Sequence, residues 1–169
     1  MDRSALIVRY RAALIVFIVG LILSGLTAFP LSRELGFLSA MLGIAADAPM
    51  ESLGGLRLWI ATVRVGLERS YAAYPWIAYG TDWLGFAHVA IAIFFIGPLR
   101  DPTRNRWVLQ AGVVCCALVL PVALIAGPLR GIPFYWRLLD CSFGIFGALP
   151  LLYCLRLSRS LEGGKDETP

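Results

Sequence analysis

YGTDWLGFAHVAIAIFFIGP, residues 79–98, is the stretch that decides the fold expected of this chain. It is apolar and has about the 20 residues that a helix needs to cross roughly 30 Å of hydrocarbon in a bilayer. The single histidine of the sequence, His88, lies at its middle. Because lipid offers no hydrogen-bond partner to backbone groups, the sequence predicts a membrane-spanning helix here rather than an open strand.

Three further segments share this apolar character. The whole chain is 59% hydrophobic and only 15% charged, whereas soluble domains carry about 25% charged residues. A chain of this composition needs lipid as part of its solvent, so we predict an all-α integral membrane protein with four transmembrane helices. The predicted spans are residues 12–29, 79–97, 107–126 and 138–155.

The size of the chain suits one compact helical unit. We therefore expect the four spans to form a single transmembrane bundle over residues 1–160. The residues that follow, 161–169, are polar and include two glycines. Because short polar ends of this kind are seldom held in place, we expect them to form a mobile tail.

The segment between the first two spans, residues 30–78, is the predicted outer loop. Ser32 as a cap, with Glu34 in the first turn, predicts a short helix that ends before Gly43. A second, amphipathic helix is predicted by an apolar stripe that recurs with helical spacing. We expect it to lie at the outer membrane surface, and a lid or a partner-binding surface is the alternative. The stripe comprises Leu56, Ile60, Val63, Leu67 and Tyr71.

The distribution of basic residues predicts the orientation. Nine lie in the N-terminal tail, in the loop between the second and third spans and in the C-terminal tail, and six lie on the opposite side. The positive-inside rule then places both termini in the cytoplasm. The net charge of +4 comes from arginines that flank apolar segments, so we expect lipid as the partner and no nucleic acid.

Polar residues inside the spans are the candidate site. His88 lies near the bilayer midplane on a stripe with small residues, so we expect it to face the protein interior. There it either hydrogen-bonds a neighbouring helix, relays protons or holds a ligand, haem or metal. Asp82 and Asp140 are predicted at similar depth near the outer surface, with Arg130 and Arg137 in reach. These four residues form either a structural ion-pair network or a binding and translocation site.

The chain lacks the short motifs that usually accompany catalysis. It has no glycine-rich phosphate loop, HExxH, GxSxG or CxxC. Its four cysteines lie inside apolar segments, where they are expected to pack as small hydrophobic side chains. We therefore predict no catalytic residue, no metal site and no cofactor, with haem bound through His88 as the remaining alternative.

Two strings resemble small bacterial inner-membrane proteins: DWLGFAHVAIAIFFIGPLRDP (82–102) and GIPFYWRLLDCSFGIFG (131–147). The likeness covers residues 79–155. It implies four helices and a bacterial inner (plasma) membrane, and it implies no activity, ligand or site residue.

Three functions remain open for a chain of this kind. The first is a non-enzymatic partner or accessory subunit of a membrane assembly, which binds another membrane protein or a second copy of itself. Its basis is the small-residue faces expected at Gly20, Ser24 and Ala28 and at Gly144 and Ala148. The second is a small oligomeric transporter or channel that uses His88, Asp82 and Asp140. The third is a haem- or cofactor-binding protein.

Overall fold

The computed structural model describes residues 3–45 and 47–163, and this part of the chain is helical without any strand. Four of its helical segments are long and apolar enough to cross a membrane. The coarse prediction, an all-helical chain with four candidate spans, is therefore confirmed. The four segments are Arg3–Leu26, Pro75–Arg100, Arg106–Leu129 and Phe134–Glu162.

The chain divides into two compact units, and each is described by itself. Unit 1 consists of Met1–Leu21 and Ala90–Pro169, and unit 2 consists of Ile22–Val89. Two long helices, α1 (Arg3–Leu26) and α4 (Ala78–Phe94), contribute residues to both units. The single bundle expected over residues 1–160 stays a prediction.

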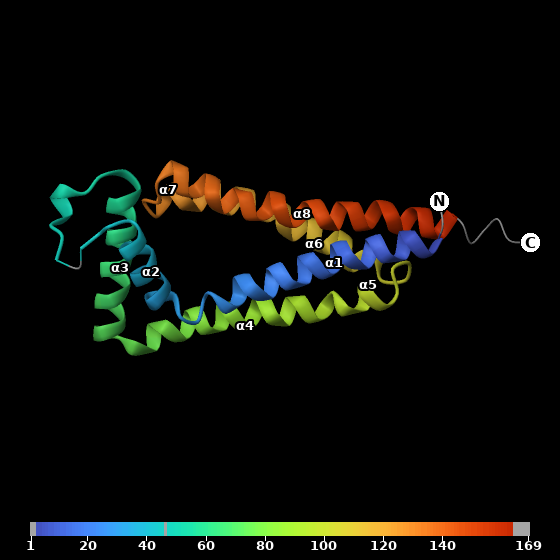
Figure 1. Ribbon diagram of the computed structural model, residues 1–169, viewed down its shortest axis with the longest axis horizontal. Helices are drawn as coiled ribbons and strands as arrows, with labels where there is room; N and C mark the ends of the chain where they lie inside the picture. The colour runs from blue at the N-terminus through green and yellow to red at the C-terminus, as the bar shows by residue number, and fades with distance from the viewer. Residues whose placement is uncertain (1–2, 46, 164–169) are drawn as a thin grey trace, which may run out of the picture. The chain divides into compact units, whose positions relative to one another are not determined.

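Unit 1 is built around the pair α6 and α8, which lie side by side (Figure 1). The third span is interrupted, because Pro121 at the end of α6 has no backbone N–H to donate. A π-helical turn follows it directly, as is usual where the regular hydrogen-bond ladder is broken. The elements after α4 are α5 (Ile96–Arg100), α6 (Arg106–Pro121), the π-helical turn (Val122–Ala126), α7 (Gly127–Leu129) and α8 (Phe134–Gly163).

The core of unit 1 joins α1, α6 and α8. Tyr10 and Leu14 of α1 are completely buried together with Leu109 of α6 and Leu151 of α8. The Tyr10 hydroxyl donates a hydrogen bond to the carbonyl oxygen of Pro98 over 3.1 Å. This bond satisfies a polar group that would otherwise be costly to bury.

Gly144 sets the spacing of α6 and α8. A Cβ atom at this position would lie 2.5 Å from the carbonyl oxygen of Cys116, closer than any real contact allows. The two backbones therefore approach each other directly, as small residues permit in membrane helices. The face of Gly144 that was expected to bind a partner thus packs against α6 of the same chain.

Unit 2 holds the two helices of the predicted outer loop, α2 (Leu31–Met41) and α3 (Gly55–Ala73), which contact each other. Both predicted helices are confirmed, but the start of α2 was wrong. Ser32 lies inside the first turn, and the residue before the helix is Pro30, whose rigid ring suits a helix start. Gly43 follows α2 with a positive φ of 64°, a conformation that glycine adopts without strain.

Two helices are longer than their apolar stretches. The structure starts α1 at Arg3 instead of residue 12 and continues α8 to Gly163 instead of residue 155. Arginine is a good helix former, so the basic ends extend the helices beyond the hydrophobic spans. Leu161 is buried in the unit 1 core, which corrects the expected start of the mobile tail. The remainder of that tail, residues 164–169, lies outside the described residues.

Candidate functional site

The residues expected to form one intramembrane site are distributed over both units. Asp82 and His88 lie on the part of α4 that belongs to unit 2. Arg130, Arg137 and Asp140 lie in unit 1. The joint cluster of Asp82 with Asp140 thus stays a prediction, and the residues of each unit are described in turn.

His88 lies where α1 and α4 cross with their backbones almost touching. A Cβ atom at Gly25 of α1 would lie 2.6 Å from the His88 Cβ and 2.9 Å from the carbonyl oxygen of Gly85. A Cβ atom at Gly85 would lie 2.5 Å from the Phe29 ring. The expectation that small residues surround His88 is confirmed, but the residue on α1 is Gly25. Gly20, which was expected on a small-residue face for a partner helix, has no neighbour within 4 Å.

The His88 imidazole is bonded to its own helix. Its Nδ1 lies 2.8 Å from the carbonyl oxygen of Leu84, one turn earlier. A carbonyl oxygen only accepts, so Nδ1 carries the hydrogen and Nε2 keeps a lone pair. At this crossing α1 presents Gly25, which has no side chain to bond the imidazole, and the roles considered for His88 stay predictions. Within residues 3–45 and 47–163, no group of three or more potential metal ligands accompanies it.

Thr81 and Asp82 lie inside α4 rather than at its start. Neither residue caps the helix, because α4 begins at Ala78. The Thr81 hydroxyl donates a hydrogen bond to the Ala78 carbonyl oxygen over 2.7 Å, and the Tyr71 hydroxyl of α3 lies 3.5 Å from it. Among the hydrogen bonds and ion pairs of the described residues, none involves the Asp82 side chain.

Arg137 packs against a glycine instead of pairing with an acid. A Cβ atom at Gly127 would lie 2.6 Å from the Arg137 Cδ, so the aliphatic stem fills the space above this glycine. The guanidinium lies 5.2 Å from the centre of the Phe134 ring, a cation–π contact. Asp140 is half-buried, and no ion pair in the described part of unit 1 links it to Arg137 or Arg130. The expected ion pairing was wrong within this unit.

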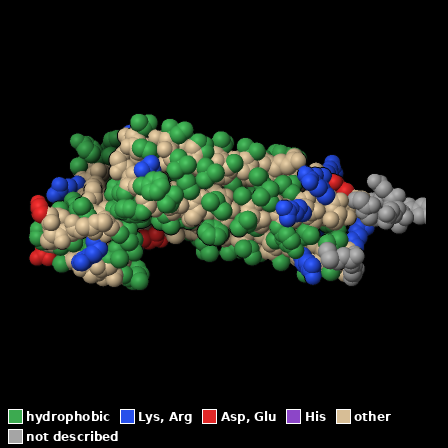
Figure 2. Space-filling model, turned by 90° about the horizontal axis from the view of Figure 1, so that it is seen from above, with side chains coloured by type: hydrophobic (Ala, Val, Ile, Leu, Met, Phe, Trp, Pro, Cys, Tyr) green, Lys and Arg blue, Asp and Glu red, His purple; other side chains and the backbone are tan. Residues whose placement is uncertain are grey.

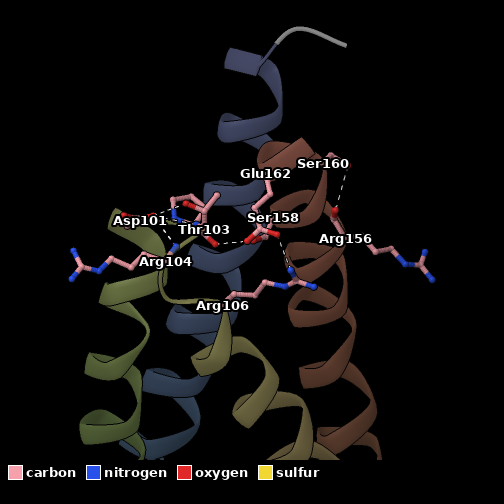
Figure 3. A network of polar contacts seen from close by, with 9 residues as sticks. Asp101, Thr103, Arg104, Arg106, Arg156, Ser158, Ser160 and Glu162 are labelled. Carbon is pink, nitrogen blue, oxygen red and sulfur yellow. Dashed lines mark hydrogen bonds and ion pairs between the residues drawn. The ribbon is translucent and has the colours of Figure 1, made fainter. Parts of the chain in front are cut away.

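A polar cluster that the sequence did not predict lies between α5 and α6 (Figure 3). One carboxylate oxygen of Asp101 accepts three hydrogen bonds, from the backbone N–H groups of Thr103 and Arg104 and from the Thr103 hydroxyl, at 3.0–3.1 Å. An aspartate often closes a turn in this way. Asn105 donates to the Gly97 carbonyl oxygen over 3.1 Å and fixes the other side of the loop.

Two contacts tie this loop to the end of α8. Arg106 and Glu162 form an ion pair with a distance of 2.8 Å between Nη1 and Oε2. The buried Ser158 hydroxyl donates a hydrogen bond of 2.8 Å to the carbonyl oxygen of Pro102. Asp101 and Pro102 are typical turn residues and could have indicated a structured loop. The residues of α8 that bind the loop, Ser158 and Glu162, each lie 56 residues from their partners in the sequence and could not be predicted. The loop was therefore interpreted as a topology signal alone.

A small cavity of about 130 Å³ opens beside the polar cluster. Arg3 from the start of α1 and Arg100 from the end of α5 line it, with Ile7 and Leu161 as apolar walls. Both arginines are exposed, and neither takes part in an ion pair or hydrogen bond of the described residues. On the face drawn in Figure 2, basic side chains gather at the helix ends, and hydrophobic ones cover the helices between them.

These observations define a class, a helical chain with four candidate membrane spans and an arginine-rich helix end. Comparison with protein-family models, with curated proteins and with solved structures gives no match. The function is therefore argued from the contacts and surfaces of the chain itself.

Proposed function

We propose that the chain is a non-enzymatic, multi-pass protein of a bacterial inner membrane that acts as a partner or accessory subunit of a membrane assembly. The observation that carries this proposal is the uncovered apolar surface of its helices. Only 17–22% of the residues in the most apolar stretch of each candidate span are buried. Exposed side chains such as Val16, Leu118 and Phe143 would be unfavourable in water, so lipid or another apolar helix covers them.

The arginines of unit 1 support cytoplasmic termini. Eight of them lie in the helices and loop that meet at the polar cluster, and two lie near the opposite ends of α6 and α8. Four more arginines lie between the first two spans, so over the whole chain the excess is the nine against six counted from the sequence, and membrane proteins keep such an excess on the cytoplasmic side. The eight are Arg3, Arg9, Arg11, Arg100, Arg104, Arg106, Arg156 and Arg159, and the two are Arg130 and Arg137.

Gly20 supports binding to a further helix in addition to lipid. It is exposed on α1, and a Cβ atom there would have no neighbour within 4 Å. The glycines Gly112 and Gly144, in contrast, are each covered by a neighbouring helix. Because an exposed glycine in a membrane helix lets a second backbone approach closely, Gly20 is a place where a partner helix can pack.

The mass of the assembly tests this function. The chain is extracted in mild detergent, and its mass is measured by native mass spectrometry against the 18.5 kDa of one chain. We expect a second copy or another membrane protein in fixed stoichiometry. Gly20→Leu should release this partner, and Ala12→Leu, which places the same side chain at another exposed position of α1, should retain it. The proposal would be contradicted if the wild-type protein had the mass of one chain alone. It would also be contradicted if both variants released the partner, or if both retained it.

The second candidate function is the oligomeric transporter or channel. What favours it is Asp140, a half-buried acid without an ion-pair partner in the described residues of unit 1. A charged group inside an apolar helix is costly and usually serves transport or binding. In liposomes, this function requires an ion or proton flux that falls when His88→Ala or Asp140→Asn is introduced. An absence of flux in the wild-type chain would exclude it.

The third candidate, haem binding through His88, depends on the free Nε2 lone pair. A bis-histidine site would need a second histidine from another copy or another protein, because this sequence has one. The purified protein would then absorb near the Soret region, and His88→Ala would abolish the absorption. Purification without any such band would remove this candidate.

A further inference from the structure

Two basic side chains line the cavity beside the polar cluster. Arg3 comes from the first turn of α1, and Arg100 from the last turn of α5, so residues 97 positions apart in sequence line one cavity. Neither side chain forms an ion pair within residues 3–45 and 47–163. Two positively charged side chains that line one cavity attract an anion to it.

Asp101 also lines the cavity, and its charge has to be considered. One of its carboxylate oxygens accepts the three hydrogen bonds that close the turn. The negative charge of Asp101 is thus stabilised by the backbone N–H groups of Thr103 and Arg104 and by the Thr103 hydroxyl. Two cations against one acid leave the cavity with a net positive charge, and the two guanidinium groups are its donors.

We propose that this cavity binds a phosphate group. Arginine presents paired N–H donors that match the oxygens of a phosphate, which makes it the usual residue for phosphate recognition. At about 130 Å³, the cavity is smaller than the roughly 300–1,000 Å³ of pockets for larger organic ligands. That size suits a single phosphate group rather than a whole metabolite.

The surroundings of the cavity fit the headgroup phosphate of an anionic phospholipid. Ile7 and Leu161 give it apolar walls, and the helices that carry Arg3 and Arg100 are candidate membrane spans that end here. Basic residues at such ends attract anionic headgroups. The lipid as source rests on the membrane location in the proposed function, whereas free inorganic phosphate would supply the same chemical group without it.

Native mass spectrometry of the full chain in detergent tests the site, with phosphatidylglycerol as the anionic lipid and phosphatidylcholine as the zwitterionic one. We expect phosphatidylglycerol to bind more tightly, because the choline cation is repelled by the two arginines. The double variant Arg3→Gln with Arg100→Gln should weaken phosphatidylglycerol binding by about thirty-fold, which corresponds to about 2 kcal/mol.

A matched control separates the cavity from the general positive charge of this end. Arg104→Gln with Arg159→Gln removes the same charge at two exposed positions that do not line the cavity. We expect this pair to weaken binding by less than about threefold, because neither side chain lines the cavity and a charge outside it acts on the bound lipid only through screened, long-range attraction. Equal loss in both pairs would overturn the proposal, since binding would then follow net charge alone.

Inorganic phosphate distinguishes the two sources. If phosphate binds and competes with lipid, and both depend on Arg3 and Arg100, the site takes free phosphate. If only phosphatidylglycerol shows that dependence, the source is the lipid. If neither ligand depends on the two arginines, no phosphate site exists here. Recovery of the chain from the soluble fraction without detergent would contradict the proposed function, and the inorganic phosphate measurement would still decide the site.

Discussion

Gly25→Ala gives a direct test of the close crossing of α1 and α4 beside His88. The added Cβ would lie 2.6 Å from the His88 Cβ, and ordinary contact begins at 3.4 Å. The difference, 3.4 − 2.6, means that the backbones must separate locally by about 0.8 Å. Neither neighbour can move away alone, because one is a Cβ atom and the other is the Gly85 carbonyl oxygen, 2.9 Å away.

The magnitude follows from two opposing terms. Overpacking of this kind costs about 1–3 kcal/mol. Alanine in the middle of a helix gains about 0.5–1 kcal/mol over glycine. We therefore expect Gly25→Ala to lower the free energy of unfolding by about 1–2 kcal/mol.

The same substitution at an open glycine provides the control. Gly36 lies inside α2, and a Cβ atom there would have no neighbour within 4 Å. Gly36→Ala should therefore be neutral or stabilising by up to about 1 kcal/mol. Both variants can be followed in detergent by the temperature at which a thiol-reactive dye labels the buried Cys141 and Cys154, after the more accessible Cys115 and Cys116 have reacted. The argument would be refuted if Gly25→Ala were as stable as Gly36→Ala.

Three further predictions concern the polar cluster and the core next to it. Ser158→Ala should cost about 1–2 kcal/mol in the free energy of unfolding, because it leaves a loop carbonyl without its donor, whereas Ser160→Ala at an exposed position should cost almost nothing. A double-mutant cycle with Arg106→Gln and Glu162→Gln should give a coupling below about 1 kcal/mol, since both side chains are partly exposed. Tyr10→Phe should cost about 1 kcal/mol through its lost hydrogen bond, and no change in stability would show that this bond contributes nothing. All three can be measured with the same thermal labelling assay.

The four candidate spans were predictable because length and apolar character are local properties of the sequence. The amphipathic helix α3 was predictable for the same reason, since its stripe repeats every turn. The ends of α1 and α8 were not, because a helix continues into basic residues wherever its backbone bonds are satisfied. Arg9 and Arg156 mark such extensions.

The surroundings of His88 were predictable in part. Gly85 and His88 lie three residues apart on α4, so helical spacing places them on one face. The partner residue on α1 was not predictable, because Gly20 and Gly25 are both small and lie on different faces of the helix. Which of them meets α4 depends on tertiary packing. The Arg106–Glu162 pair escaped prediction for a related reason, since it joins two helices that are distant in sequence.

The polar cluster explains why a pair of exposed arginines can act as a site. Long side chains on a mobile loop would have to be ordered when an anion binds, and this ordering costs about 0.5–1.5 kcal/mol for each side chain. Here the Asp101 turn and the Ser158 hydrogen bond hold the loop that follows Arg100. Arg3 is the first residue of α1, whose next two turns pack in the unit 1 core. The backbone of each arginine is therefore fixed before binding, as it is for the other arginines at this end, and what distinguishes this pair is that both side chains line one cavity.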